Sequence, residues 1–449
     1  MLSTRNLHKN QNRGFLIAGT QSSSGKTAVA ALLLAALRQR GIPVQPFKVG
    51  PDFIDPGYHR AYAGTDSVNL DAWIMGEAEV RRAVERFTRN AVGVVEGVMG
   101  LFDGANPDND AGSTFEIARW LGWPLLLVVP CAHAGRSIVA SIRGFLHEAG
   151  PERCLGVILN QASSEGHATY LRKACASLEV PLLGIVPKLP ELDWPERHLG
   201  LQASTERELP EPEILAKLAE QHLEMEQILS AVNPPAEESQ RRFETPQPAS
   251  VRKRIGVAQD TAFHFYYRAN LEWLREQGVE VVPFSPLSDS AVPEKLDGLV
   301  LGGGFPEVFA EQVSGNGALL KSLREAVASG MPCYAECGGL MLLAEGLETK
   351  EGRRFPMVGV VPGVVRMTDQ LQHFGYCRGV AEGFPEARGH EFHHSEWVEE
   401  SELANLWTVT RHSTGASRRE GFHTETLHAS YVHLHFPQAA PLVRKVLRL

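Results

Sequence analysis

The chain has 449 residues, of which 43% are hydrophobic and 22% charged, with a formal net charge of −9 and a mean hydropathy of −0.16. A chain of this length is too long to fold around a single hydrophobic core, which predicts two or three domains. The acidic balance argues against nucleic-acid binding, because little positive charge remains to neutralise a phosphate backbone. The sequence has no uninterrupted apolar run of about eighteen residues, so no membrane span is expected.

The cysteines and the first residues bear on the compartment. The six cysteines are scattered without Cys-x-x-Cys pairing, which indicates reduced thiols in a chain of this size. Residues 1–14 are polar and basic and lack the apolar core of a secretory signal. We therefore expect a cytoplasmic protein.

A predicted strand, loop and helix near the N-terminus form the pattern of a nucleotide-binding loop. An apolar strand at Phe15–Ala18 runs into a Gly/Ser-rich turn that ends in Gly-Lys-Thr before an apolar helix. Backbone N–H groups there can face an anion, Lys26 supplies a positive charge, and the Thr27 hydroxyl can hold Mg²⁺. Five residues separate Gly19 from Gly25, where the common loop has four. The residues predicted to bind the nucleotide through this loop are Gly19, Thr20, Ser23, Ser24, Gly25, Lys26 and Thr27.

Acidic residues follow two further predicted strands. Asp52 and Asp55 lie on a Pro/Gly-rich loop directly after the strand Val44–Val49. Asp, Pro and Gly are common turn residues, so a turn alone would explain these two aspartates. A nearby phosphate loop favours Mg²⁺ coordination instead, because Mg²⁺ is held by one or two carboxylates plus phosphate oxygens. Glu96 ends another apolar strand, the usual position of a metal-organising acid in P-loop enzymes. Asp103 is a second acid on the loop after Glu96.

Apolar strands continue to alternate with helices up to residue 232, which predicts a parallel sheet covered on both faces. The further strands are expected at Leu125–Pro130, Gly156–Leu159 and Leu182–Pro187. Ligands of such sheets bind at the carboxyl ends of the strands, where the phosphate loop, Asp52, Glu96 and Asn160 all fall. We therefore predict a doubly wound α/β domain over residues 14–232.

A second α/β pattern follows a polar, proline-rich segment. Residues 233–254 lack periodicity and are predicted to be an interdomain linker. Strands then alternate with helices again, which predicts a second doubly wound domain over residues 255–449.

Cys337 is the candidate nucleophile of this second domain. It lies at a tight strand-to-helix turn and is followed by two glycines, as in a nucleophile elbow, where N–H groups can hold an oxyanion. A helix N-terminus also lowers the pKa of a thiol. The other five cysteines are predicted to be buried structural thiols.

Histidines near the C-terminus are candidate bases for the thiol. Residues 429–436 alternate as a strand, which places His433 and His435 on one face, and either could be the base. A second histidine cluster at 389–394 lacks a recognised metal-ligand spacing, which disfavours zinc. His390 and His393 are expected to line a pocket or to be core residues whose polar groups have partners.

These motifs carry a resemblance to known families. The first half resembles the dethiobiotin-synthetase-like P-loop ligases, and the second resembles a class I glutamine amidotransferase domain. The motifs at 48–56, 96–104, 195–201, 389–393 and 429–436 together resemble the cobyrinic acid a,c-diamide synthase family of cobalamin biosynthesis. The resemblance covers nearly the whole chain, except for the first dozen residues and the linker.

The resemblance implies a two-site reaction. Glutamine is hydrolysed in the second domain, and the ammonia passes to the first. There ATP phosphorylates the a and c acetate carboxylates of a corrinoid, and ammonia attacks each acyl phosphate. A homodimer is a further possibility.

The resemblance also assigns residues. It implies that Lys26 and Thr27 bind the phosphates and Mg²⁺. Asp52 and Glu96 would organise the metal, and Asn160 would recognise adenine. In the second domain it makes Cys337 the nucleophile and His435 its base. Triad-type domains usually carry an acid two residues after this histidine, whereas here the segment reads His-Phe-Pro-Gln, so the group that orients the histidine stays open. Candidate substrate-binding residues are Asp55, Asp103, Arg197 and His198.

Three alternatives remain open. The first is a related amidotransferase, either cobyric acid synthase, which the segment 50–56 disfavours, or the enzyme that diamidates nickel-sirohydrochlorin. The second is a partitioning-type switch ATPase, but such proteins carry an extra lysine early in the loop, where this chain has Gln21 and Ser22. The third is an ammonia-using enzyme with a degenerate second half, which the presence of both Cys337 and His435 disfavours.

Overall fold

The computed structural model describes residues 13–192, 209–232, 251–398 and 406–449. The chain divides into two compact units, Met1–Phe243 and Glu244–Leu449, and each is described by itself. Most of the predicted linker 233–254 lies outside the described residues. Its last two residues, Lys253 and Arg254, are not linker but belong to the first strand of the second unit.

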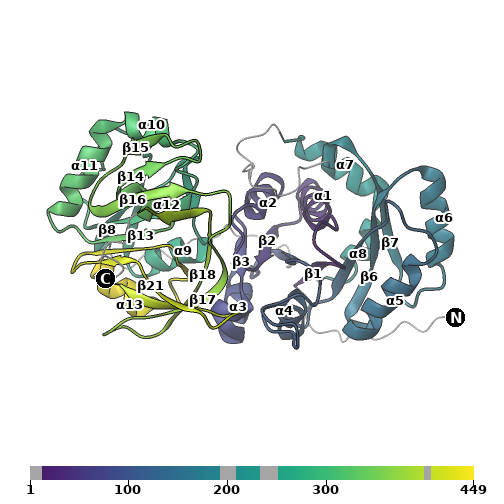
Figure 1. Cartoon of the computed structure of the whole chain (residues 1–449). Coiled ribbons are helices and arrows are strands. Elements are labelled where there is room, and N and C mark those ends of the chain that lie inside the picture. Colours follow the sequence, from purple (N-terminus) through teal and green to yellow (C-terminus); the bar gives the residue numbers. More distant parts are fainter. Residues whose placement is uncertain (1–12, 193–208, 233–250, 399–405) are drawn as a thin grey trace. The chain divides into compact units, whose positions relative to one another are not determined.

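The first unit is built on a seven-stranded sheet in which every neighbouring pair of strands is parallel (Figure 1). The strand order is β3-β2-β4-β1-β5-β6-β7. The strands are β1 (Gly14–Gly19), β2 (Val44–Val49), β3 (Val68–Leu70), β4 (Val92–Glu96), β5 (Leu125–Pro130), β6 (Cys154–Ala162) and β7 (Leu182–Pro187). Because β1 is the central strand, the phosphate loop that follows it lies at the middle of the sheet edge.

Helices cover both faces of this sheet and create two apolar cores. Side chains of α1, α7 and α8 pack in one core, and side chains of α3 to α6 pack in the other. The helices are α1 (Lys26–Gln39), α2 (Asp55–Ala63), α3 (Ala72–Phe87), α4 (Thr114–Leu121), α5 (Ile138–Ala149), α6 (Glu165–Cys175), α7 (Pro212–His222) and α8 (Met225–Leu229), with short 3₁₀ helices at Pro151–Arg153 and Pro190–Leu192. The apolar run after the phosphate loop is explained by α1, which is buried on all sides from Ala28 to Leu37.

The second unit contains a six-stranded sheet in the order β10-β8-β11-β13-β23-β22, parallel except for its last pair. The doubly wound prediction is confirmed for this sheet. Its strands are β8 (Lys253–Ala258), β10 (Val279–Phe284), β11 (Gly298–Leu301), β13 (Cys333–Glu336), β22 (Phe422–His423) and β23 (Leu427–Ser430). The helices of this unit are α9 (Arg268–Glu276), α10 (Ala310–Gly315), α11 (Gly317–Ala328), α12 (Gly338–Leu343) and α13 (Ala440–Leu447).

Three smaller sheets extend this unit beyond the predicted architecture. A pair joins β12 to β9, a mixed sheet has the order β15-β14-β16-β19, and an antiparallel sheet has the order β21-β20-β17-β18-β24. Their strands are β9 (Phe263–Phe265), β12 (Gly303–Gly304), β14 (Ala344–Glu348), β15 (Arg354–Pro356), β16 (Val361–Met367), β17 (His373–Val380), β18 (Ala387–His393), β19 (Ser395–Trp397), β20 (Trp407–Arg411), β21 (Ser417–Glu420) and β24 (His433–Leu434).

The predicted strand at 429–436 is wrong, because the chain changes sheets within it. β23 ends at Ser430 and pairs with β13 in the parallel sheet, whereas β24 at His433–Leu434 pairs with β18 in the antiparallel sheet. His433 and His435 therefore do not share the face of one continuous strand.

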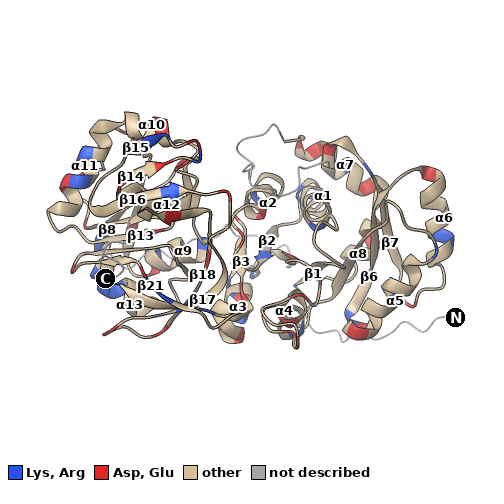
Figure 2. Ribbon diagram, viewed as in Figure 1, with Lys and Arg blue, Asp and Glu red and all other residues tan. Residues whose placement is uncertain are grey.

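Charged residues of both signs are mixed on outer helices. Figure 2 shows Lys and Arg interspersed with Asp and Glu on α6, α7 and α11. Within the described ranges, each helix is too short or too polar to cross a membrane.

Candidate active sites

The loop between β1 and α1 has the backbone of a phosphate-binding loop. Ser23 and Gly25 adopt left-handed conformations, with φ of +56° and +88°, directly before α1 begins at Lys26. A Cβ on Gly25 would lie 1.8 Å from Nδ2 of Asn160, so only glycine fits at this position. The Asn160 amide in turn donates to the Ser24 carbonyl at 3.1 Å. Asn160 thus braces the loop, a contact that the sequence did not predict, and its part in adenine recognition stays a prediction.

Lys26 and Ser24 add polar side chains to this loop. The Lys26 ammonium donates to the carbonyls of Met99 at 2.6 Å and Gln21 at 3.2 Å. Ser24 is fully buried, and its Oγ has no hydrogen-bond partner within the described residues. A buried donor of this kind is normally satisfied, and a phosphate oxygen would satisfy it. The loop therefore fits an anionic nucleotide.

The segment after β4 packs along the loop. The N–H of Leu101 donates to the Gly19 carbonyl at 2.8 Å, and a Cβ on Gly100 would lie 3.2 Å from the carbonyl oxygen of Thr20. Asp103 is exposed and accepts from the N–H of Gly100 at 2.8 Å. Asp103 thus stabilises the turn beside the phosphate loop, and its predicted contact with substrate is untested.

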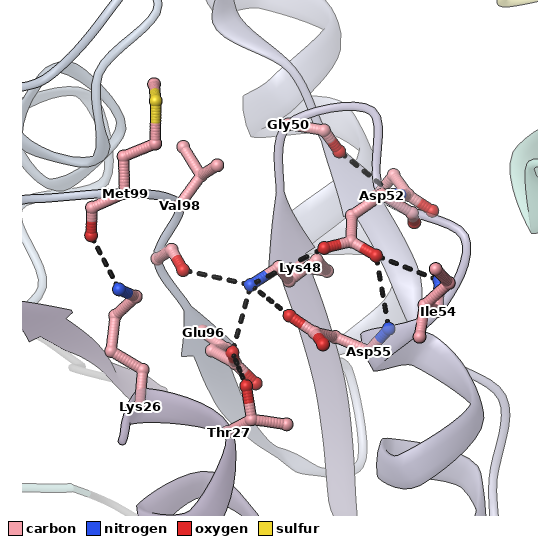
Figure 3. A network of polar contacts seen from close by, with 12 residues as sticks. Lys26, Thr27, Lys48, Gly50, Asp52, Ile54, Asp55, Glu96, Val98 and Met99 are labelled. Carbon is pink, nitrogen blue, oxygen red and sulfur yellow. Dashed lines mark hydrogen bonds and ion pairs between the residues drawn. The ribbon is translucent and has the colours of Figure 1, made fainter. Parts of the chain in front are cut away.

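Lys48 of β2 lies among the predicted acids and connects them to the loop (Figure 3). Its ammonium is 2.7 Å from Oδ2 of Asp55, 2.9 Å from Oε1 of Glu96 and 4.0 Å from Oδ2 of Asp52. The same Glu96 oxygen accepts a hydrogen bond from the Thr27 hydroxyl at 2.7 Å. Side chains from β2, the β2–α2 loop, β4 and α1 therefore meet at one point.

The other oxygen of Glu96 is held by His59. Nε2 of His59 lies 2.6 Å from Oε2 of Glu96, and Nδ1 lies 2.9 Å from Oγ of Ser67. Burial alone would raise the pKa of Glu96, but the positive charge of Lys48 and the hydrogen bond to His59 outweigh it, so the pKa is lowered. Glu96 is therefore an ionised carboxylate in a fixed orientation.

Asp52 combines turn chemistry with the ionic network. Its Oδ1 accepts from the N–H groups of Ile54 at 2.8 Å and Asp55 at 3.1 Å, and this fixes the turn before α2. Its Oδ2 faces Lys48. Asp55 is buried at the first turn of α2, where an anion is favourable.

The donor set of this network fits Mg²⁺ when a nucleotide is present. Carboxylates and a threonine hydroxyl are hard oxygen ligands, and three carboxylates around one lysine leave an excess of negative charge. Among the described residues, no group of three or more His, Cys, Asp or Glu side chains could hold a metal ion. The protein would therefore supply one or two ligands, and phosphate oxygens and water would complete the shell.

Cys337 lies at a strained turn between β13 and α12. Its φ is +46°, and its N–H donates to the Ser430 carbonyl at 2.7 Å. A Cβ on Gly339 would lie 2.1 Å from the Leu301 carbonyl oxygen, and one on Gly338 would lie 3.1 Å from the nitrogen of Gly304. The two glycines thus let the turn pack against neighbouring backbone, as a nucleophile elbow requires.

His433, and not His435, forms a hydrogen bond with the Cys337 thiol. Nδ1 of His433 also lies 3.5 Å from Oε2 of Glu336. Burial lowers the pKa of His433, but its contacts with the thiol and with the Glu336 carboxylate outweigh burial and raise the pKa to about 10. The imidazole is therefore positively charged at neutral pH.

The choice of His435 as base is corrected by its surroundings. Its ring packs edge-on against Tyr267, with ring centroids 6.0 Å apart, and neither ring nitrogen has a hydrogen-bond partner among the described residues. Burial lowers its pKa to about 3. His435 is thus a neutral core residue, two positions away from the histidine that meets the thiol.

The two histidines of β18 occupy different places. His390 stacks on His433, with ring centroids 4.9 Å apart. His393 stacks on Tyr431, and its Nδ1 lies 2.9 Å from the carbonyl oxygen of Ser395. The predicted substrate residues Arg197 and His198 lie outside the described residues.

Comparisons with known proteins match both units. Residues 15–201 match the CobQ/CobB/MinD/ParA nucleotide binding domain, and residues 254–441 match the CobB/CobQ-like glutamine amidotransferase domain. A cobyrinate a,c-diamide synthase of Priestia megaterium is 40% identical over 444 residues, which are 96% of each chain. A protein of the same name from Syntrophotalea carbinolica is 42% identical, over 94% of this chain and 95% of the relative.

The chain belongs to the cobyrinate a,c-diamide synthase family. The match of both units, over nearly the full length of these relatives, excludes a free-standing switch ATPase and confirms an ATP-dependent ligase that uses glutamine.

Three residues of this family member were missed as site residues. They are Lys48 in β2, His59 in α2 and Glu336 at the end of β13, directly before the nucleophile. The available signal for Lys48 is a lysine in a fully buried strand that ends beside two aspartates. For His59 and Glu336 the partners are distant in sequence, and no local pattern marks them.

Proposed function

We propose that this chain uses ATP and glutamine to amidate the a and c acetate carboxylates of cobyrinic acid or hydrogenobyrinic acid through acyl phosphates. The proposal rests on one observation: each unit contains a set of side chains suited to one of the two reactions. The first unit has a phosphate loop linked through Thr27 to ionised Glu96. The second has a thiol hydrogen-bonded to a charged imidazole.

In the first unit the chain's own residues bind and orient. The loop N–H groups and Lys26 would hold the phosphates of ATP, and Thr27 would share a cation with Glu96. Bound Mg²⁺ would draw charge from the phosphate oxygens during transfer to the carboxylate. Lys48 holds Asp55 and Glu96 in place, and His59 fixes the orientation of Glu96.

A carboxylate is a poor acyl donor until one of its oxygens becomes a leaving group. Transfer of the terminal phosphoryl group of ATP onto the substrate carboxylate provides that leaving group. Ammonia then attacks the acyl carbon, phosphate departs, and the amide remains. Asp55 and Asp103 remain candidates for holding the corrinoid, and Asn160 for reading adenine.

In the second unit glutamine would be cleaved through a thioester. The Cys337 sulfur attacks the side-chain carboxamide carbon, and backbone N–H groups at the start of α12 would stabilise the tetrahedral oxyanion. The C–N bond breaks as His433 passes its proton to the departing nitrogen, which leaves as ammonia. Water then attacks the thioester, with neutral His433 taking its proton, and glutamate leaves as the thiol is restored.

The choice of substrate is tested by offering the purified enzyme several polycarboxylates. Cobyrinic acid, hydrogenobyrinic acid and nickel-sirohydrochlorin would each be incubated with ATP, Mg²⁺ and glutamine, and the products measured by mass spectrometry. We expect two carboxylates of a corrin to become amides, which lowers the product mass by about one dalton at each site. Diamidation of nickel-sirohydrochlorin without reaction of either corrin would contradict the proposal.

A further inference from the structure

We propose that Glu336 is the positioning acid of the glutaminase site, which orients His433 toward the Cys337 thiol. This inference rests on the glutaminase activity proposed above and adds the group that the sequence left open. The residue precedes the nucleophile directly, whereas triad-type domains usually place their acid two residues after the histidine.

Glu336 contacts both the ring and the backbone of the histidine segment. Its Oε2 lies 3.5 Å from Nδ1 of His433, and its Oε1 accepts from the N–H of Leu434 at 2.9 Å. The second contact fixes β24, on which His433 lies. With Nδ1 directed at the carboxylate, Nε2 is the ring nitrogen available to the thiol, and this is the geometry that a general base requires.

A buried tyrosine holds the carboxylate from the other side. The Tyr334 hydroxyl donates to Oε1 of Glu336 at 2.6 Å. Burial and the negative charge of Glu336 raise the pKa of Tyr334 well above its ordinary value, so it stays a donor. Glu336 is only 6% exposed, and a carboxylate at such a site requires a charged partner, which His433 provides.

Burial holds two other titratable groups beside the pair in their neutral forms. His390 of β18 stacks on His433 with 18° between the rings, and burial holds its pKa well below the ordinary value. The Tyr267 hydroxyl lies 3.1 Å from Nδ1 of His390. Tyr431, which lies close enough to the Cys337 thiol to interact with it electrostatically, has a pKa raised by burial. Burial thus keeps His390 and Tyr431 from supplying a charge beside His433.

The position two residues after His433 is His435, which cannot orient it. His435 is buried and neutral, with a pKa lowered to about 3. The acid therefore comes from the strand that carries the nucleophile. Because Glu336 ends β13 and Cys337 begins the turn, one short segment supplies both the thiol and the group that orients its base.

The test measures how the reactivity of the Cys337 thiol depends on pH in the full-length enzyme. Alkylation of Cys337 by iodoacetamide would be followed against pH, with a Cys337→Ala protein subtracted to remove the other five cysteines. In Glu336→Gln the step of the alkylation curve that follows deprotonation of His433 should move down by about one pH unit or more, because loss of an opposite charge within about 4–6 Å lowers the pKa of the imidazole by that amount. Glutamine hydrolysis at neutral pH should fall by about 10-fold or more.

Two control variants distinguish a general loss of structure from the loss of the positioning role proposed for Glu336. Glu348→Gln removes a carboxylate that pairs with Arg366 at 2.6 Å in the same unit, and it should leave the alkylation curve in place. Glu336→Asp keeps the charge and should restore much of the curve. Both Glu336 variants should retain amidation with ammonium.

The outcomes separate this inference from the proposed function. If Glu336→Gln loses glutaminase activity but keeps the wild-type alkylation curve, the residue is merely structural and the inference fails. If the wild-type enzyme itself does not hydrolyse glutamine, the proposed function fails instead.

Discussion

The two candidate active sites differ in how their parts are distributed along the chain. The phosphate loop is contiguous, since Gly19 to Thr27 supply the turn, the cation and the hydroxyl within one segment. The thiol site joins the end of β13 to β24, about a hundred residues further along. A contiguous site can be recognised from spacing alone, whereas a site assembled from two sheets depends on where the chain turns between them.

The strongest test of this contrast is to inactivate the thiol site and to supply its product, ammonia, from solution. In Cys337→Ala the thioester route is lost, so glutamine-dependent amidation should fall by about 10³-fold or more. The phosphate loop is untouched, and ammonium at alkaline pH should restore the diamide, measured by mass spectrometry. A folded Cys337→Ala protein that ammonium does not rescue would show that the two sites are not separable.

A matched pair of substitutions tests the assignment of the base. His433→Gln should lower glutamine hydrolysis by about 10²- to 10⁴-fold, because the general acid and base is removed from the thiol. His435→Gln should stay within about threefold of wild type, because His435 does not meet the thiol and contributes nothing to proton transfer. The measurement is glutamate release by the two folded proteins. A larger loss in His435→Gln than in His433→Gln would indicate that His435 is the base.

Lys26→Ala should break the other site alone. Loss of the loop cation should lower amidation by about 10²-fold or more with either nitrogen donor, since positive charge at the transferred phosphate is removed. Hydrolysis of glutamine without corrinoid should persist. Amidation by Lys26→Ala at the wild-type rate would refute the phosphate-loop assignment.

Glu96→Gln is expected to have a smaller effect. It keeps the shape of the side chain but removes one charge from the network of Lys48 and Thr27. Amidation should fall by at least about 10-fold, most clearly at limiting Mg²⁺. Titration of the rate against Mg²⁺ checks this, and an unchanged curve would argue against a metal role for Glu96.

The fold and the first site were largely predictable because their signals are local. Strands buried on both faces read as continuous apolar runs, and a strand, glycine loop and helix already define where a phosphate binds. The positions of Glu96 and Asp52 followed from the rule that parallel strands share one ligand-binding edge.

The remaining features depend on contacts between distant segments. Lys48 lies in the buried strand β2, and only the folded sheet places its ammonium between Asp55 and Glu96. The alternation at 429–436 predicted one strand, but pairing with β13 ends at Ser430 and pairing with β18 includes His433. A period of two cannot reveal a change of sheet, so the choice between two histidines was decided by tertiary structure.

The central claim, that nitrogen released at the thiol reaches an acyl phosphate in the same enzyme, is tested most directly by an isotope measurement. The wild-type enzyme would receive cobyrinic acid, ATP, Mg²⁺ and glutamine labelled with ¹⁵N in the side-chain amide, and the product would be analysed by mass spectrometry. We predict a diamide that carries the label at both new amides, and no product when ATP is omitted. A diamide without label, or one formed without ATP, would contradict the account.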